Sequence, residues 1–117
     1  MIEFNNNVGE EFAMARFHNG MRPVHPGEIL REEYLVPLDL SIAELAKELH
    51  VDTAQIDAIV RGNAGVTSEI ALRLARYFGG DAETWLNLQQ AYDLKTAEQQ
   101  VGDAIRSEVA PRKAKAA

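Results

Sequence analysis

The apolar positions of this chain recur at helical spacing, most clearly in two adjoining stretches, residues 41–49 and 53–60. Steps of three and four residues place the apolar side chains of each stretch on one helical face. Only residues 50–52 separate the stretches, so we expect a tight turn whose corner Val51 fills. The spacing is that of a helix-turn-helix. The apolar residues are Ile42, Leu45, Ala46 and Leu49 in the first stretch and Ile56, Ile59 and Val60 in the second.

Two interpretations of this unit stay open at this point. Any two amphipathic helices joined by a short turn give a similar pattern, and a helical hairpin need not bind DNA. In addition, His50 stands where glycine is usual, because that residue of the turn often takes a left-handed conformation. Histidine tolerates such a conformation better than a branched residue does. The pattern therefore fits both a DNA-binding helix-turn-helix and a plain helical hairpin.

Three further helices are predicted around this unit, each bounded by residues that commonly begin or end helices. No strand pattern of any strength is present, so we expect an all-α fold of five helices around one small core. A short additional helix is expected at residues 103–109. The further helices are predicted from Pro26 to about Leu35, from Thr67 or Ser68 to Phe78, and from Asp81 toward Gln99.

The chain divides into a central domain, residues 22–100, and two extensions that we expect to be flexible. In residues 1–21 asparagines and glycines interrupt every periodicity. This extension is either a frayed terminus or a segment that docks on a partner through its phenylalanines. Residues 101–117 are expected to hold the short helix and a disordered tail.

Composition excludes several classes of protein. The chain has 117 residues, of which 46% are hydrophobic, as expected for one globular domain. It has no cysteine for a disulfide or a thiolate metal site. It also lacks an apolar run of ~20 residues and the apolar region of a signal peptide, so a cytoplasmic location is expected.

Candidate catalytic and metal chemistry is also missing from the sequence. The three histidines, His18, His25 and His50, lie in different segments, with no spacing that would bring two of them to one metal. We interpret His25, between two prolines, as a packing or capping residue. No arrangement of serine, histidine and aspartate and no glycine-rich phosphate loop can be recognised. We therefore expect no enzyme, no cofactor and no metal site.

The net charge of −6 bears on the choice of partner. It argues against sequence-independent binding to nucleic acid, which depends on many lysines and arginines. Specific binding through a local patch stays open, because charge on one face matters more than the total. An acidic surface also suits a basic protein partner.

Two signatures flank the predicted helix-turn-helix: HPGE at residues 25–28, and WLNLQ at 85–89 followed by YDL at 92–94. With these motifs, residues 21–95 resemble the HigA-type antitoxins, also called VapI-like or plasmid-maintenance antidote proteins, of the XRE helix-turn-helix superfamily. The resemblance implies a lambda-repressor-like fold and a homodimer. It also implies that the protein neutralises a small basic ribonuclease toxin of the HigB/RelE type and represses its own operon. A two-fold dimer would bind an inverted repeat.

A recognition helix reads bases from its first residues and from its next exposed turn. Here those positions are Asp52, Thr53, Ala54, Asp57 and Ala58, and none is the arginine or glutamine common in HigA-like relatives. The two carboxylates would repel phosphates, although Asp52 can also cap the helix. Carboxylates can accept from cytosine amino groups, and Thr53 and Ala54 can touch thymine methyls.

Other candidate contacts lie around the same unit. Gln55 can reach a phosphate or a base edge, and Arg61 and Asn63 can reach a phosphate at the helix end. Lys47 can contact the backbone from the first helix, and the cap at Ser41 leaves amide donors that suit a phosphate. Arg61 fits equally well as a solvated surface charge. The complete candidate set is Ser41, Lys47, Thr53, Ala54, Gln55, Arg61 and Asn63.

The last long helix places three large side chains on one face, Trp85, Leu88 and Tyr92. The resemblance implies that this helix lies near the dimer contact, whereas the residues themselves favour a core position for Trp85. Two functions then remain. One is a DNA-binding repressor that also neutralises a toxin. The other is a protein-interaction antitoxin with a degenerate helix-turn-helix, which the acidic recognition helix favours. Family habit favours the first, which we prefer. A regulator without any toxin is a third alternative.

Overall fold

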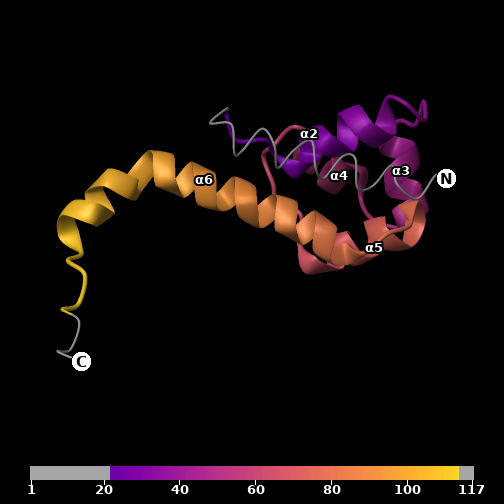
Figure 1. The fold of residues 1–117 in the computed structure, drawn as a ribbon. Coiled ribbons are helices and arrows are strands. Elements are labelled where there is room, and N and C mark those ends of the chain that lie inside the picture. The colour runs from indigo at the N-terminus through magenta and orange to yellow at the C-terminus, as the bar shows by residue number, and fades with distance from the viewer. Residues whose placement is uncertain (1–21, 114–117) are drawn as a thin grey trace.

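The computed structural model describes residues 22–113, and within this range the chain forms five helices and no strand (Figure 1). The predicted all-α fold is confirmed. The first helix is α-helical over its first half and continues without a break as a π-helical turn, η1. The expected N-terminal extension, residues 1–21, and the last four residues of the C-terminal extension, 114–117, lie outside the described residues. The elements are α2 (Pro26–Leu30), η1 (Arg31–Leu35), α3 (Ile42–Leu49), α4 (Thr53–Val60), α5 (Ser68–Phe78) and α6 (Ala82–Glu108).

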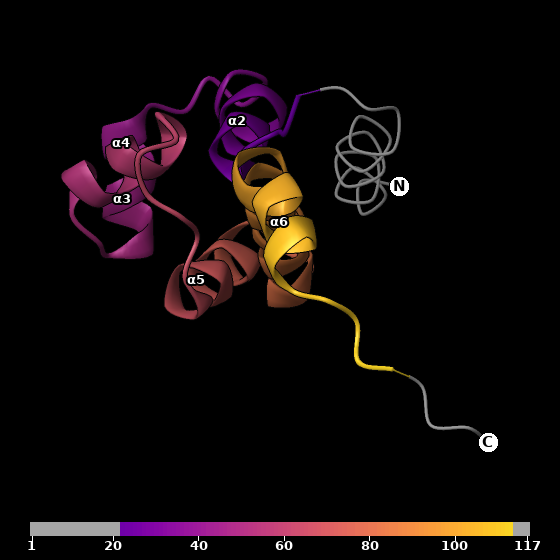
Figure 2. The ribbon, with the colours of Figure 1, turned by 90° about the vertical axis from the view of Figure 1, so that its left-hand side faces the viewer.

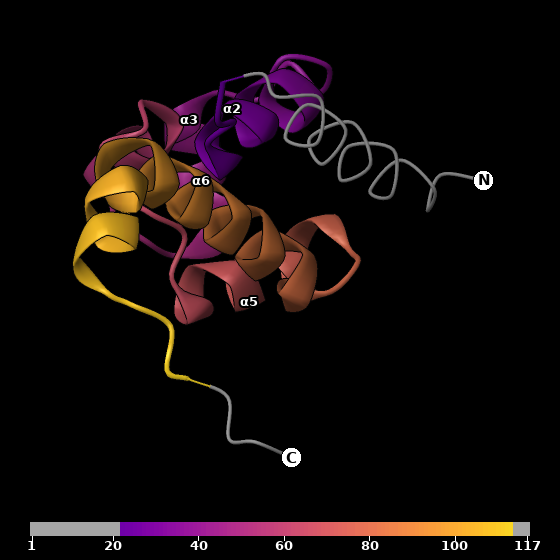
Figure 3. The same ribbon diagram turned by 60° about the vertical axis from the view of Figure 1, so that its left-hand side comes forward.

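Helix α4 is held between two neighbouring helices. Helix α4 lies against α3 and α2, while α5 lies against α3 and α6. The first half of α6 passes between α2 and α5 (Figures 2 and 3). Its second half projects away from the other helices (Figure 1). The buried face of every helix meets in one core. That core consists of Val24, Ile29, Leu30, Leu35, Leu45, Ala46, Leu49, Ile56, Ile59, Val60, Val66, Ile70, Ala71, Leu74, Trp85 and Leu88.

The turn between α3 and α4 has the predicted geometry. His50 takes a left-handed conformation, with φ 61° and ψ 44°. The amide of Val51 donates to the carbonyl of Ala46 at 3.0 Å, which closes the end of α3. Val51 itself is half-buried and packs against the core. The turn therefore brings α4 against α3, whose Ala46 is buried in the core.

Three helix caps also match the prediction. The Ser41 hydroxyl accepts a hydrogen bond from the amide of Glu44, and the Glu44 carboxylate accepts one from the amide of Ser41. Together they form a capping box at α3. Thr67, rather than Ser68, caps α5, and Asp81 caps α6. Asp52 occupies the N-cap position of α4, but its side chain makes no capping hydrogen bond.

The separate helix expected at 103–109 does not exist as such. Helix α6 runs unbroken to Glu108 and passes through Gly102. A glycine inside a helix costs only about 1 kcal/mol and so does not have to end it. Here the side chains of Glu98 and Arg106 form an ion pair of 2.7 Å across the glycine. The Arg106 guanidinium also forms an ion pair with Asp103 at 2.6 Å. The absence of a side chain at Gly102 leaves room for this bridge.

The HPGE segment seats the first helix on the end of α4. Pro26 begins α2, and the Nδ1 atom of His25 accepts from the amide of Gly27 at 2.9 Å. A Cβ atom on Gly27 would lie 1.8 Å from the carbonyl oxygen of Ile59. Only glycine therefore permits this approach of α2 to the backbone of α4. Glu28 is paired with Arg22 at 2.9 Å.

We expect Gly27→Ala to destabilise the fold by about 3 kcal/mol, the upper end of the usual cost of overpacking, because the colliding atoms belong to the backbone and neither helix can yield without losing core contacts. The measurement is the free energy of unfolding from urea denaturation. Gly102→Ala is the matched control: its Cβ meets only the mobile end of Glu98, so it should stabilise by up to about 1 kcal/mol. Equal stability of the two variants would contradict this account.

Candidate nucleic-acid interface

The exposed residues of α4 gather in its first turn. Thr53, Ala54 and Gln55 are exposed, while Ile56 and Ile59 are fully buried. Because the buried face is fixed by α2 and α3, the first turn stands clear of the domain with its three side chains outward. This is the part of a recognition helix that enters a major groove. The structure thus brings three of the predicted contacts together on one exposed turn.

The C-terminal end of α4 carries two opposite charges that offset each other. The Arg61 guanidinium binds the Asp57 carboxylate at 2.8 Å, one helical turn apart. Both side chains are more than a third exposed, so the pair contributes little to stability. Its effect is electrostatic: Asp57 offsets the positive charge that Arg61 would present to a phosphate. Asp52 is exposed at the other end of the helix.

The loop that follows α4 is folded back against the helix. Gly62 takes φ 80°, and the amides of Asn63 and Ala64 donate to the carbonyl of Ala58 at 2.8 and 3.2 Å. The loop side chain predicted to reach a phosphate, Asn63, is exposed beside Arg61. These two contacts therefore lie together at the C-terminal end of α4.

The two predicted contacts on α3 differ from each other. Lys47 is exposed and makes no ion pair among those found in the described residues. Ser41 has both its amide and its hydroxyl engaged by Glu44, at 2.8 and 3.0 Å. The bond from the Ser41 amide lowers the pKa of Glu44, so an ionised carboxylate already occupies this helix end. A phosphate approaching Ser41 would meet that negative charge.

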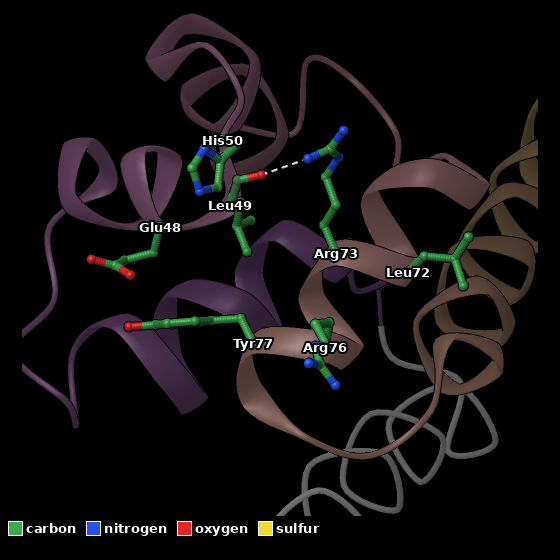
Figure 4. Close-up of a pocket in the computed structure, with 7 residues that line it drawn as sticks. All are labelled: Glu48, Leu49, His50, Leu72, Arg73, Arg76 and Tyr77. Carbon is green, nitrogen blue, oxygen red and sulfur yellow. Dashed lines mark hydrogen bonds between the residues drawn. The ribbon is translucent and has the colours of Figure 1, made fainter.

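Arg73 of α5 is a positioning residue that the sequence did not reveal. It donates to the carbonyl of Leu49, the last residue of α3, at 2.8 Å (Figure 4). It is also paired with Glu69. The guanidinium thereby fixes the end of α3 just before the turn into α4. In the sequence, Glu69 and Arg73 form an ordinary pair on a helix surface. A contact 24 positions along the chain leaves no local signal.

His25 is a buried cap, as the sequence indicated. Its ring meets Tyr92 edge-on, with 4.8 Å between centroids, so the HPGE segment also touches α6. Burial lowers the pKa of His25, opposed by the charge of Asp93 and a hydrogen bond with the backbone of Ala64. The residues described here contain no group of three or more acidic or histidine side chains that could hold a metal.

The predicted dimer or core residues divide. Trp85 and Leu88 are buried in the core, whereas Tyr92 is half-buried against His25. None of the described helices combines the length and apolar character needed to cross a membrane.

Comparison with known proteins gives consistent results. A family model described as Helix-turn-helix matches residues 30–85. Virulence-associated protein I of Dichelobacter nodosus is 63% identical over 81 residues, covering 69% of this chain and 75% of that protein. The structure of Pseudomonas aeruginosa antitoxin HigA with higBA promoter is 44% identical, with a TM-score of 0.77, covering 79% of this chain and 100% of that one. The antitoxin GraA in complex with its operator is 49% identical, with a TM-score of 0.76, covering 80% and 95%.

The lowered pKa of His25 predicts a loss of stability in acid. Between the folded and unfolded pKa values the unfolded chain binds more protons, so the free energy of unfolding should fall as the pH drops through the ordinary 6.5 and level off below the folded value. Urea denaturation from about pH 8 to about pH 5 measures this. His25→Asn keeps a capping oxygen but should lose the acid-dependent fall in the free energy of unfolding. His50→Asn, at an exposed position, should keep that fall. An unchanged acid slope in His25→Asn would contradict the assignment.

Proposed function

The chain belongs to the HigA-type antitoxins of the XRE helix-turn-helix family, a non-enzymatic class of DNA-binding proteins, and from this premise we propose that it represses its own promoter as a homodimer and neutralises a basic toxin of the HigB/RelE class. The observation that supports DNA binding most directly is the exposed first turn of α4, held clear of the core by α2 and α3. Relatives of 44% and 49% identity with the same fold have been solved with promoter or operator DNA.

We assign base contacts to the exposed turn, Thr53 to Gln55, and phosphate contacts to Lys47, Arg61 and Asn63. Ser41 is left out of this set because Glu44 occupies its hydrogen-bonding groups. The threonine and alanine methyls suit thymine, and the glutamine amide suits adenine or a phosphate. With few cations in the set, binding should depend only weakly on salt compared with basic repressors.

A degenerate helix-turn-helix is the second candidate, and the carboxylates of α4 favour it. Helix α4 and its two caps carry two carboxylates, Asp52 and Asp57, but only one cation, Arg61, which is paired with Asp57. If the repulsion between these carboxylates and DNA phosphates outweighs the favourable DNA contacts, the chain keeps its fold and its binding to the toxin but does not bind the operator. The effect of Asp57 on Arg61 separates the two candidates.

Pairing of two copies is supported by the part of α6 beyond the core. Leu94, Val101 and Ile105 are exposed there, at 71%, 44% and 50%. Their spacing of seven and then four residues follows one helix stripe, as in helices that pair along a seam. A two-fold dimer built on this stripe would present two copies of α4 to an inverted repeat.

The toxin is assigned to a surface at the other end of the first helix, which we call the acidic loop surface (residues 31–44). It holds four carboxylates, Glu32, Glu33, Asp39 and Glu44, against one arginine and one exposed apolar pair. That pair, Val36 and Leu38, is 64% and 59% exposed.

The loop that carries the apolar pair is not loose. The amide of Leu38 donates to Tyr34 at 3.1 Å, and that of Leu40 donates to Leu35 at 2.9 Å. A preformed apolar patch within an acidic rim fits a basic protein partner. It repels DNA, and it also repels a second copy of itself.

The DNA contacts predict opposite effects for the two members of the ion pair. Asp57→Asn removes a negative charge and frees Arg61, so affinity for the promoter should rise roughly fivefold, while Arg61→Ala should lower it by roughly the same factor. Fluorescence anisotropy with promoter DNA across a salt series measures both. Arg112→Ala removes an equal charge from an exposed position near the C-terminus and should change little. No saturable binding by the unaltered protein or by Asp57→Asn would leave the degenerate candidate.

The acidic loop surface predicts a variant that separates the two activities. Val36→Ser with Leu38→Ser should weaken binding of the proposed basic toxin by at least about tenfold, because the central apolar contact is lost. Calorimetry with that protein and rescue of growth on co-expression measure the effect; promoter binding should be unchanged. Leu72→Ser, at an equally exposed leucine on α5, is the control. Weakening by Leu72→Ser alone would move the toxin to the other surface.

A further inference from the structure

We propose that Gln89 of α6 is a positioning residue that holds the loop after α4, residues 61–66, in place for contact with DNA; the inference rests on the proposed operator binding and extends it. The Gln89 side-chain oxygen accepts from the amide of Val66 at 2.7 Å. Its side-chain nitrogen donates to the carboxylate of Asp93 at 3.0 Å, one turn further along α6. The loop is thus tied to a helix 23 positions away in the chain.

The direction of the Gln89 amide is set by chemistry. Asp93, when ionised, can only accept, so it selects the nitrogen of Gln89, and the oxygen then turns to Val66, whose amide can only donate. The loop lies directly on this amide: a Cβ on Gly65 would be 3.1 Å from the side-chain carbon and nitrogen of Gln89. The two hydrogen bonds and the bare backbone of Gly65 together fix the height of the loop above α6.

The other end of the loop is fixed to α4. The amides of Asn63 and Ala64 both bind the carbonyl of Ala58, and His25 bonds the backbone of Ala64 from the first helix. The loop is therefore held by hydrogen bonds to α4 at one end and to α6 at the other, with Arg61 and Asn63 exposed. If the loop were free, each contact with a phosphate would first have to order it. Holding it in the bound conformation removes that entropic cost.

The same geometry links α6 to the C-terminal end of α4, where Arg61 and Asn63 lie. Gln89, Tyr92 and Asp93 lie on one face of α6, over the loop and His25. The projecting stripe that we assign to the second copy continues from this same helix. Pairing along α6 and placement of the loop thus depend on a single rigid element.

The test compares three variants of the full chain on its own promoter DNA. Gln89→Leu removes both hydrogen bonds and should lower operator affinity about tenfold. Gln90→Leu, the same change at the exposed neighbour, is the matched control and should bind as the unaltered protein does. Gln89→Glu with Asp93→Asn exchanges donor and acceptor, keeps both hydrogen bonds and should restore affinity to within about twofold, whereas Gln89→Glu alone should not.

Amide hydrogen exchange gives a readout that does not involve DNA. In Gln89→Leu the amide of Val66 should exchange at least about tenfold faster while those of α4 and α5 keep their protection, which a general loss of stability would not produce. Faster exchange at Val66 with unchanged operator affinity would overturn the positioning role. So would failure of the exchanged pair to restore binding. If the unaltered protein binds no operator, the proposed function fails. A Val66 amide that stays protected in Gln89→Leu would separately show that Gln89 does not hold the loop.

Discussion

The close approach of Gly27 to the carbonyl of Ile59 is the constraint on which the arrangement of helices depends. It sets the first helix directly on the last turn of α4, with no side chain between the two backbones. His25, the cap of that helix, then reaches Tyr92 of α6 and the backbone of Ala64. One short segment thus orients the recognition helix, the loop behind it and the long helix that projects from the domain. The HPGE signature supplies the residues that make this contact, with Gly27 allowing the close approach and His25 capping the helix.

Local features of the fold could be predicted because their causes are local. The apolar spacing of α3 and α4 determines which faces are buried, and the left-handed residue falls at His50 because a turn of that length requires one. Caps at Ser41 and Asp81 follow from short polar side chains that bond nearby amides. The same local reasoning predicts a break near Gly102, but α6 continues through it, because one glycine costs a helix only about 1 kcal/mol.

The interactions that position the candidate site could not be predicted, since they join distant segments. Arg73 reaches the end of α3, and Gln89 reaches the amide of Val66; in the sequence both are ordinary polar residues on amphipathic helices. The exposed turn from Thr53 to Gln55 was predictable from periodicity alone. Whether that turn contacts bases depends on charges that offset one another in space, such as Asp57 and Arg61, and their pairing is visible only in the fold.

We propose that this acidic chain binds its operator through α4 and the loop that follows it, residues 61–66. The most direct measurement is a titration of the isotope-labelled protein with its own promoter repeat, followed by amide NMR shifts. The account predicts saturation at two chains per repeat, as two-fold symmetry requires, with the perturbed amides concentrated in residues 53–58 and 61–66. Shifts that stay absent, or that fall on the acidic loop surface instead, would contradict it.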